Sequence, residues 1–219
     1  MPLIQARLAE RIGTIAFDNY AKRNALSGGL IAECLEALSR FEADKARAVV
    51  IRSAAPQKVW SAGHAVDELP QAGRDPLSYD DPLVSLLRAV RAFPAPVIAM
   101  VQGSAWGGAC DLVMSCDIVL GDETCAFAIT PAKLGLPYNA LGVLHFLNRL
   151  PLNIVTEMFC TAEPVGAERA LGSASSTRWC RRRSWRRGRW LWRAPSPVAR
   201  PRPSPPSRRR RWRWPRRRR

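Results

Sequence analysis

The sequence predicts an α/β fold in which parallel strands alternate with helices. Residues 47–53, RAVVIRS, form a β-branched apolar run that is typical of parallel strands covered on both faces. Residues 96–120 predict a strand, a glycine-rich turn, a helix and a second strand, in that order. Other segments carry apolar residues at helical spacing. Strands that alternate with helices favour a parallel sheet.

The first elements follow from simple patterns. Residues 3–9 and 11–17 alternate in the manner of strands, with a turn near Glu10 and Arg11. Ser27 can cap the helix that follows. The apolar face of that helix is expected to contain Leu30, Ile31, Cys34, Leu35, Leu38 and Phe41.

The later elements are shorter. Residues 59–63, VWSAG, predict a strand, and residues 69–82 predict a long loop rich in Pro, Gly and Asp. A helix begins near Leu83 and ends at the prolines after Phe93. TCAFAIT predicts one more short strand, and residues 141–171 are expected to be helical with a break at Pro164.

The charge of the chain is concentrated at one end. The sequence of 219 residues has 34 Lys and Arg against 18 Asp and Glu, a formal net charge of +16. Residues 173–219 hold 19 arginines and no acidic residue, whereas residues 1–172 hold 15 basic and 18 acidic residues. The first 172 residues therefore have the composition of an ordinary globular domain. A basic nucleic-acid-binding domain over the whole chain is excluded.

Residues 173–219 also contain 7 prolines and 6 tryptophans but no lysine. Three interpretations stay open. The segment is an arginine-rich tail that contacts phosphates and stacks on bases, a plain disordered tail, or GC-rich DNA translated out of frame. The abrupt change within a helical pattern, VGAERALG, favours the third. We therefore expect a domain over residues 1–172, followed by a disordered segment over residues 173–219.

The sequence argues against a membrane protein and against an exported protein. No apolar run reaches the roughly 18 residues that a membrane-spanning helix needs, and the N-terminus has no apolar stretch of signal-peptide length. The six cysteines include no C-x-x-C pair and are expected to be reduced and mostly buried. We expect a cytoplasmic protein.

Two glycine-rich turns are the candidates for chemistry: VWSAGHAVDEL at residues 59–69 and VQGSAWGGACDLVMSCD at residues 101–117. Neither matches a phosphate loop or a dinucleotide fingerprint. A turn that leads into a helix exposes backbone N–H groups at a positive dipole end. Two such groups that point at one spot would stabilise a developing oxyanion. The alternative is that glycine only relieves crowding in two tight turns.

Four blocks of sequence in one order resemble the crotonase (enoyl-CoA hydratase/isomerase) superfamily: WSAGHAVDELP, GRDPLSYDDPL, GSAWGGACDLVMSCD and TPAKLGLPYNALG. The resemblance covers residues 3–172. It implies a crotonase-like spiral of ββα turns and assembly into a homotrimer or a dimer of trimers. It also implies a C-terminal helical region. We expect that region to be missing here or replaced by the arginine-rich segment.

The resemblance implies specific site residues. The backbone N–H groups of His64 and Gly108 would form an oxyanion hole for a thioester carbonyl. Tyr138 would orient a substrate carboxylate without adding charge. Thr130 would support it with a hydrogen bond, and Trp106 would form a wall of the pocket.

Hydratases of this superfamily use two glutamates. The first corresponds to Asp111, which we count with the catalytic residues, and the second falls at Ala132, where no acid is present. Hydration requires two placed acid/base groups, so the missing acid argues against it. Tyr138 in GLPYN instead resembles the tyrosine of the superfamily's decarboxylases. His145 lies in an apolar helical stretch and is expected to be packed in the core.

The resemblance also implies where coenzyme A lies, along residues 21–25 and 62–64. Lys22 and Arg23 would meet its phosphates in charge-assisted contacts, unless they are simply a solvated pair. Asp67 and Glu68 are expected to cap a helix or to face solvent. The residues expected to bind substrate or coenzyme A, besides Trp106 and Thr130, are Lys22, Arg23, Ala25, Ala62, Ala65, Val66, Asp67 and Glu68.

The implied function is decarboxylation of methylmalonyl-CoA to propanoyl-CoA and CO2 through a thioester enolate, without a metal or any cofactor beyond the coenzyme A of the substrate. One alternative is a related enzyme that acts on another acyl-CoA. The alternative from a different class is nucleic-acid binding through the arginine-rich segment. We expect an acyl-CoA partner and neither a membrane nor a nucleic acid.

Overall fold

The strands of this computed structural model, which describes residues 1–68, 77–173 and 177–179, lie in two sheets. The first sheet has, in spatial order, β1 (Ile4–Ala9), β2 (Ile12–Phe17), β3 (Ala48–Ser53), β5 (Val97–Val101), β7 (Ile118–Gly121) and β10 (Thr177–Trp179). The second has β4 (Val59–Ser61), β6 (Ser104–Trp106), β8 (Ala126–Ala128) and β9 (Val165–Gly166). Apart from the antiparallel pairs β1–β2 and β8–β9, neighbouring strands are parallel.

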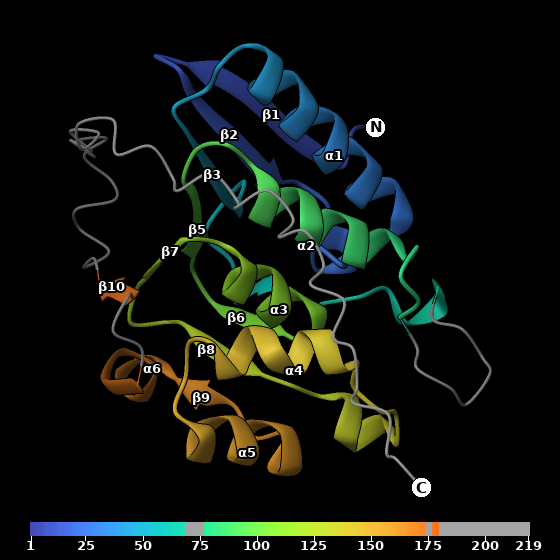
Figure 1. Cartoon of the computed structure of the whole chain (residues 1–219), viewed down its shortest axis with the longest axis vertical. Coiled ribbons are helices and arrows are strands. Elements are labelled where there is room, and N and C mark those ends of the chain that lie inside the picture. Colours follow the sequence, from blue (N-terminus) through green and yellow to red (C-terminus); the bar gives the residue numbers. More distant parts are fainter. Residues whose placement is uncertain (69–76, 174–176, 180–219) are drawn as a thin grey trace, which may run out of the picture.

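Helices follow the strands and cover the sheets (Figure 1). The α-helices of the described residues are α1 (Gly28–Ala43), α2 (Pro82–Ala92), α3 (Gly108–Ser115), α4 (Ala140–Leu147), α5 (Leu152–Thr161) and α6 (Ala167–Ser173). Short 3-10 helices occupy Tyr20–Lys22, Val66–Glu68 and Pro131–Leu134.

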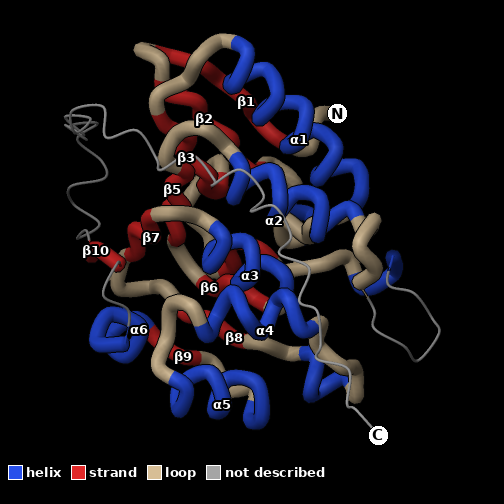
Figure 2. Tube along the Cα trace, in the orientation of Figure 1, coloured by secondary structure: helices blue, strands red, loops and turns tan. Residues whose placement is uncertain are grey.

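The chain repeats one unit: a strand in the first sheet, a strand in the second sheet, then a helix. This order is seen in β3–β4–α2 and again in β5–β6–α3, as the trace in Figure 2 shows. Between β5 and β6 the chain turns at Gly103, with a φ of +79°, and a Cβ there would lie 2.3 Å from the carbonyl oxygen of Gln57. Only glycine fits so close an approach. The repeat confirms the α/β spiral of ββα turns.

The N-terminal half agrees with the predicted elements. Glu10 and Arg11 turn the β1–β2 hairpin with positive φ values of 50° and 60°. Ser27 caps α1, because its Oγ accepts a hydrogen bond from the N–H of Leu30. Strand β3 lies between β2 and β5 and is parallel to both, and its Val49 is fully buried.

A tryptophan fixes the start of the second sheet. Trp60 on β4 is fully buried, and its ring lies 5.2 Å from that of Phe17 on β2. Its Nε1 donates to the carbonyl oxygen of Met100 on β5 at 3.0 Å, so this large side chain has a partner for its one polar atom. The loop that follows β4 therefore leaves from a rigid point of the core.

Some elements differ from the expectations. The stretch 103–107 was expected to be a turn, but Ser104–Trp106 forms β6, because its backbone pairs with both β4 and β8. The helical region after residue 140 breaks at Pro151 as well as around Pro164, where β9 pairs with β8. Proline lacks the N–H that a continuous helix needs.

The arginine-rich segment is described only in part. Residues 177–179 form β10, which pairs in parallel with β7 and lies at the edge of the first sheet, and α6 ends at Ser173. The rest of the predicted disordered segment lies outside the described residues, as do residues 69–76 of the predicted long loop.

In the described part of the chain, no helix is both long enough and apolar enough to cross a bilayer. Four cysteines of that part are buried thiols, and Cys160 is an exposed one.

Candidate active site

A pocket that is open to solvent lies where the loop after β4 meets the start of α3 and the segment 130–139. Its wall is mainly apolar side chains and glycine backbone. Leu83 closes it from α2, and Leu134 and Leu136 close it from the segment after β8. The expected site residues that line it are Ala62, His64, Val66, Gly108, Thr130 and Tyr138.

Two backbone N–H groups meet at this pocket. Gly108 is the first residue of α3, where the N–H has no partner within the helix. The His64 N–H and the Gly108 N–H make no hydrogen bond to another described residue. A Cβ built on Gly108 would lie 3.4 Å from the nitrogen of His64. Two free donors from different loops are therefore side by side.

The loop that carries His64 is held from both sides of that residue. The N–H of Leu26 donates to the carbonyl oxygen of Gly63 at 2.7 Å, and the N–H of Ala65 donates to that of Leu26 at 3.4 Å. This pairing leaves the N–H of His64 pointing away from residue 26. The sequence places a free donor at residue 64 because its neighbours take the backbone partners.

A buried asparagine anchors the same loop. Asn24 is fully buried and has a positive φ of 51°. Its Nδ2 donates to the carbonyl oxygen of Trp60 at 3.0 Å, and its own carbonyl oxygen accepts from Ser61 Oγ at 2.7 Å. Asparagine tolerates the left-handed region better than most residues. The loop 19–26 is thereby joined to β4 directly before the site.

Glycines allow the two donor loops to approach. Gly63 has a φ of +86°, and a Cβ there would lie 2.3 Å from the carbonyl oxygen of Trp106 and 3.2 Å from the nitrogen of Gly108. Gly107 has a φ of +49° and precedes α3. A side chain at position 63 would push the two loops apart. The glycines of both turns therefore do more than relieve crowding within each turn.

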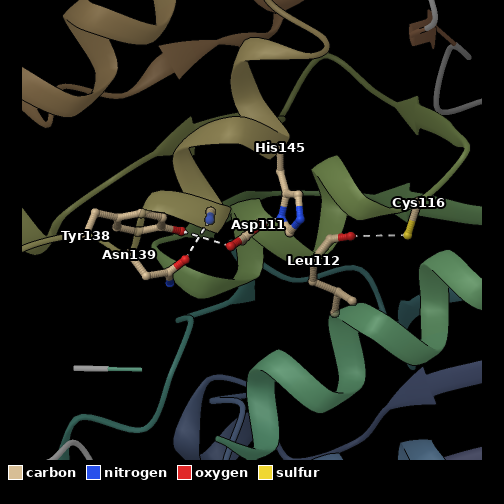
Figure 3. A network of polar contacts seen from close by, with 7 residues as sticks. Asp111, Leu112, Cys116, Tyr138, Asn139 and His145 are labelled. Atoms are coloured by element: carbon tan, nitrogen blue, oxygen red, sulfur yellow. Dashed lines mark hydrogen bonds and ion pairs between the residues drawn. The ribbon is translucent and has the colours of Figure 1, made fainter. Parts of the chain in front are cut away.

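Tyr138 stands across the pocket and connects it to a buried polar network (Figure 3). Its hydroxyl donates to Asp111 Oδ2 at 3.5 Å. Burial raises the pKa of Tyr138 well above its usual value, and the nearby Asp111 raises it further. The phenol therefore stays protonated and remains a hydrogen-bond donor at neutral pH.

Asp111 lies behind Tyr138 and does not line the pocket. It is fully buried on α3, and its Oδ1 lies 2.5 Å from His145 Nδ1 on α4. His145 is buried as expected, but as the partner of a carboxylate rather than as a packing residue. The two residues are 34 positions apart in the sequence, so no local pattern relates them.

The ring of His64 is held in place as well. Its Nδ1 lies 3.0 Å from the carbonyl oxygen of Ala65, and its Nε2 lies 3.5 Å from Asp81 Oδ2. Asp81 also caps α2 by accepting from the N–H of Leu83 at 2.8 Å. His64 lines the pocket, and its ring lies against Asp81 at the start of α2.

The remaining expected residues lie around the pocket rather than in it. Lys22 and Arg23 are exposed at the end of the first 3-10 helix. Glu68 Oε2 accepts from the N–H of Gly28, the first residue of α1, at 2.7 Å. Trp106 is not among the residues that line the pocket, and its indole N–H donates to Ser104 Oγ on the same strand. The other residues outside the pocket wall are Ala25, Ala65 and Asp67.

Within the described residues, no group of three or more His, Cys, Asp or Glu side chains could hold a metal ion.

The enoyl-CoA hydratase/isomerase family model matches residues 7–173. The chain belongs to this family. Methylmalonyl-CoA decarboxylase of Escherichia coli (strain K12) is 43% identical over 161 residues, which are 74% of this chain and 62% of that protein. The human mitochondrial enoyl-CoA hydratase domain-containing protein 3 is 34% identical over 168 residues, 76% of this chain and 55% of that protein. The chain thus spans less than two thirds of either curated relative.

Solved structures of the enoyl-CoA hydratase/isomerase family have the same fold. A methylmalonyl-CoA decarboxylase in complex with 2-nitronate-propionyl-CoA superposes with a TM-score of 0.77 at 39% identity, over 81% of this chain and 68% of that chain. The human enoyl-CoA hydratase domain-containing protein 3 gives a TM-score of 0.73 at 26% identity, over 84% of this chain and 73% of that chain. The resemblance to the crotonase superfamily is confirmed.

Proposed function

We propose that this chain, a member of the enoyl-CoA hydratase/isomerase family, carries the acyl-CoA site of a methylmalonyl-CoA decarboxylase. The similarity to the Escherichia coli decarboxylase supports the substrate. One observation of the site carries the proposal. Among the described residues, no Asp, Glu, Lys or Arg side chain lines the pocket, while Tyr138 presents a neutral hydrogen-bond donor.

The proposed reaction moves one electron pair through the thioester. The C–C bond to the carboxylate breaks and CO2 leaves. The electron pair of that bond forms the C=C bond of an enolate, whose oxygen accepts hydrogen bonds from the N–H groups of His64 and Gly108. C2 of the enolate then takes a proton from water, which yields propanoyl-CoA and leaves a hydroxide ion in the solvent. The electron sink is the thioester itself, so the proposed reaction needs no metal or other cofactor.

An uncharged pocket suits a substrate that must lose a carboxylate. The described residues of the pocket wall carry no cationic side chain that would stabilise the substrate carboxylate. Because CO2 is uncharged, the transition state is less disfavoured there than the ground state. A second negative charge in the pocket would repel the substrate. Asp111, held behind Tyr138 and paired with His145, stays out of the pocket wall.

Hydration of an unsaturated acyl-CoA fits the site less well. Hydration requires two protein side chains that act on the substrate as acid and base. Position 132 is an alanine and supplies no such group, and Asp111 is fully buried. A steady-state assay separates the two activities. Formation of propanoyl-CoA and CO2 from methylmalonyl-CoA supports the proposal, whereas hydration of crotonyl-CoA without CO2 release refutes it.

The coenzyme A arm is proposed to lie along the exposed edge of the site. Lys22 and Arg23 are exposed, and the loop that bears them accepts a hydrogen bond from the N–H of Ala62 at the pocket, through the carbonyl oxygen of Arg23. Their positive charges suit the phosphates of the cofactor arm. Assembly as a homotrimer or a dimer of trimers stays a prediction.

Replacing Tyr138 by phenylalanine is expected to lower kcat/KM for methylmalonyl-CoA by about 10- to 100-fold, the value of one hydrogen bond to a charged group. The ring keeps its edge-on contacts with Phe146 and Phe159, so the fold is preserved. Steady-state release of CO2 checks the effect, with thermal unfolding as the control. An unchanged kcat/KM rejects the role of the hydroxyl.

A further inference from the structure

A buried contact between a histidine and an aspartate lies directly behind the proposed carboxylate site. His145 Nδ1 on α4 lies 2.5 Å from Asp111 Oδ1 on α3, and the two side chains are 3% and 1% exposed. Figure 3 shows His145 approaching Asp111 from the side opposite to Tyr138. The pair belongs to neither donor loop, and the proposed reaction uses neither side chain directly.

The pair nevertheless reaches the pocket through a single phenol. Asp111 has one oxygen on His145 and the other 3.5 Å from the hydroxyl of Tyr138. At 3.5 Å this second contact is at the outer limit of a hydrogen bond. The phenol therefore loses little when its hydroxyl turns to a substrate carboxylate instead.

Helix α4 packs closely against Asp111 and Tyr138. Asn139 Oδ1 caps α4 by accepting from the N–H of Gly142 at 2.6 Å. A Cβ on Gly142 would lie 2.8 Å from Asp111 Oδ2 and 2.4 Å from Tyr138 Cε1. Glycine at this position thus lets α4 bring His145 onto Asp111, and any larger residue would separate the three groups.

A carboxylate buried this deeply needs a compensating partner. With His145 in place, one oxygen of Asp111 has the imidazole Nδ1 as its partner. Without His145, the carboxylate of Asp111 would depend on the hydroxyl of Tyr138 as its hydrogen-bond donor and would hold that hydroxyl away from the substrate. It would also repel a second carboxylate held on the other side of the phenol.

We propose that His145, acting through Asp111, is the positioning residue that lets the pocket accept a carboxylated acyl chain rather than a neutral one. This inference rests on the proposed function and deepens it, because it assigns the discrimination for the carboxylate to a residue outside the pocket wall. Tyr138 makes the contact with the substrate carboxylate, and His145 keeps Tyr138 free to do so.

The test compares two thioether ligands, 2-carboxypropyl-CoA and propyl-CoA. They differ by one carboxylate, and neither has the thioester carbonyl that decarboxylation requires, so calorimetry measures binding alone. The wild-type chain should bind 2-carboxypropyl-CoA more tightly. In His145→Gln its Kd should rise about tenfold, as expected when one like charge is uncovered nearby, while that of propyl-CoA should change less than about twofold.

A second variant separates charge from packing. Asp111→Asn in the His145→Gln background removes the uncovered anion and should restore the Kd of 2-carboxypropyl-CoA to within about threefold of wild type. It also keeps the test informative if the single variant fails to fold, because an Asn–Gln pair leaves no buried charge. Asp122→Asn is the matched control, since Asp122 is another buried carboxylate, with Gln102 and Thr124 as partners.

The outcomes are distinct. If His145→Gln weakens both ligands equally, as Asp122→Asn is expected to do, His145 is only structural and the inference is wrong. A failed rescue by Asp111→Asn overturns it as well. Turnover of methylmalonyl-CoA by the wild-type chain is scored separately. Its absence together with the expected ligand preferences would reject the proposed reaction and retain the role of His145.

Discussion

Replacing Gly108 by proline is expected to lower kcat for methylmalonyl-CoA by about 100- to 1,000-fold, the effect of losing one oxyanion donor. Proline has no backbone N–H, so the enolate oxygen would retain only the donor of His64. Gly108 is the first residue of α3, a position where proline is well tolerated because that N–H has no helical partner. The loss should therefore appear in kcat, measured as CO2 release, while the thermal unfolding temperature should change about as much as it does in Gly108→Ala.

Gly108→Ala is the matched control for this variant. It keeps the N–H but adds a Cβ that would lie 2.6 Å from Leu83 Cδ2, the end of a flexible side chain. The alanine variant thus reports the effect of the Cβ, and the ratio of the two kcat values reports the loss of the N–H together with the ring carbon that replaces its hydrogen. Equal kcat values for the proline and alanine variants would show that Gly108 is not an oxyanion donor.

Much of the fold could be predicted because its elements carry their own signals. The β-branched run of β3 and the Ser27 cap of α1 depend only on neighbouring residues. Strand β6 was missed for the opposite reason. Ser104–Trp106 is a three-residue strand between glycines, too short for a period of two to show. It exists because β4 and β8 pair with its two edges.

Several residues of the pocket were predicted from the sequence, but the contacts among the buried residues behind it were not. The two glycine turns indicated free N–H groups, and the resemblance supplied Tyr138 and Thr130, which both line the pocket. The contact between Asp111 and His145 could not be predicted, because the packing of α4 on α3 alone brings them together. Trp106, expected in the pocket wall, is not among the residues that line the pocket, and its indole N–H donates to Ser104.

Replacing Gly63 by alanine is the second substitution expected to lower the rate strongly, since Gly63 controls the distance between the two donor loops. Alanine at this position would place a Cβ 2.3 Å from the carbonyl oxygen of Trp106, at a φ of +86°. The loop would have to move and carry the His64 N–H away from that of Gly108. Because a shift of about 1 Å can cost about 100-fold in rate, kcat/KM for methylmalonyl-CoA should fall by that order.

The same substitution should lower the free energy of unfolding by about 1–3 kcal/mol, the cost of a strained backbone position. Gly135→Ala provides the comparison, because Gly135 has a φ of +66° but no atom within 4 Å of its would-be Cβ. Alanine there meets the same unfavourable φ without a collision. Thermal unfolding and kcat/KM, measured together, separate the two effects. Wild-type kcat/KM in Gly63→Ala would mean that the spacing of the two N–H groups does not limit the reaction.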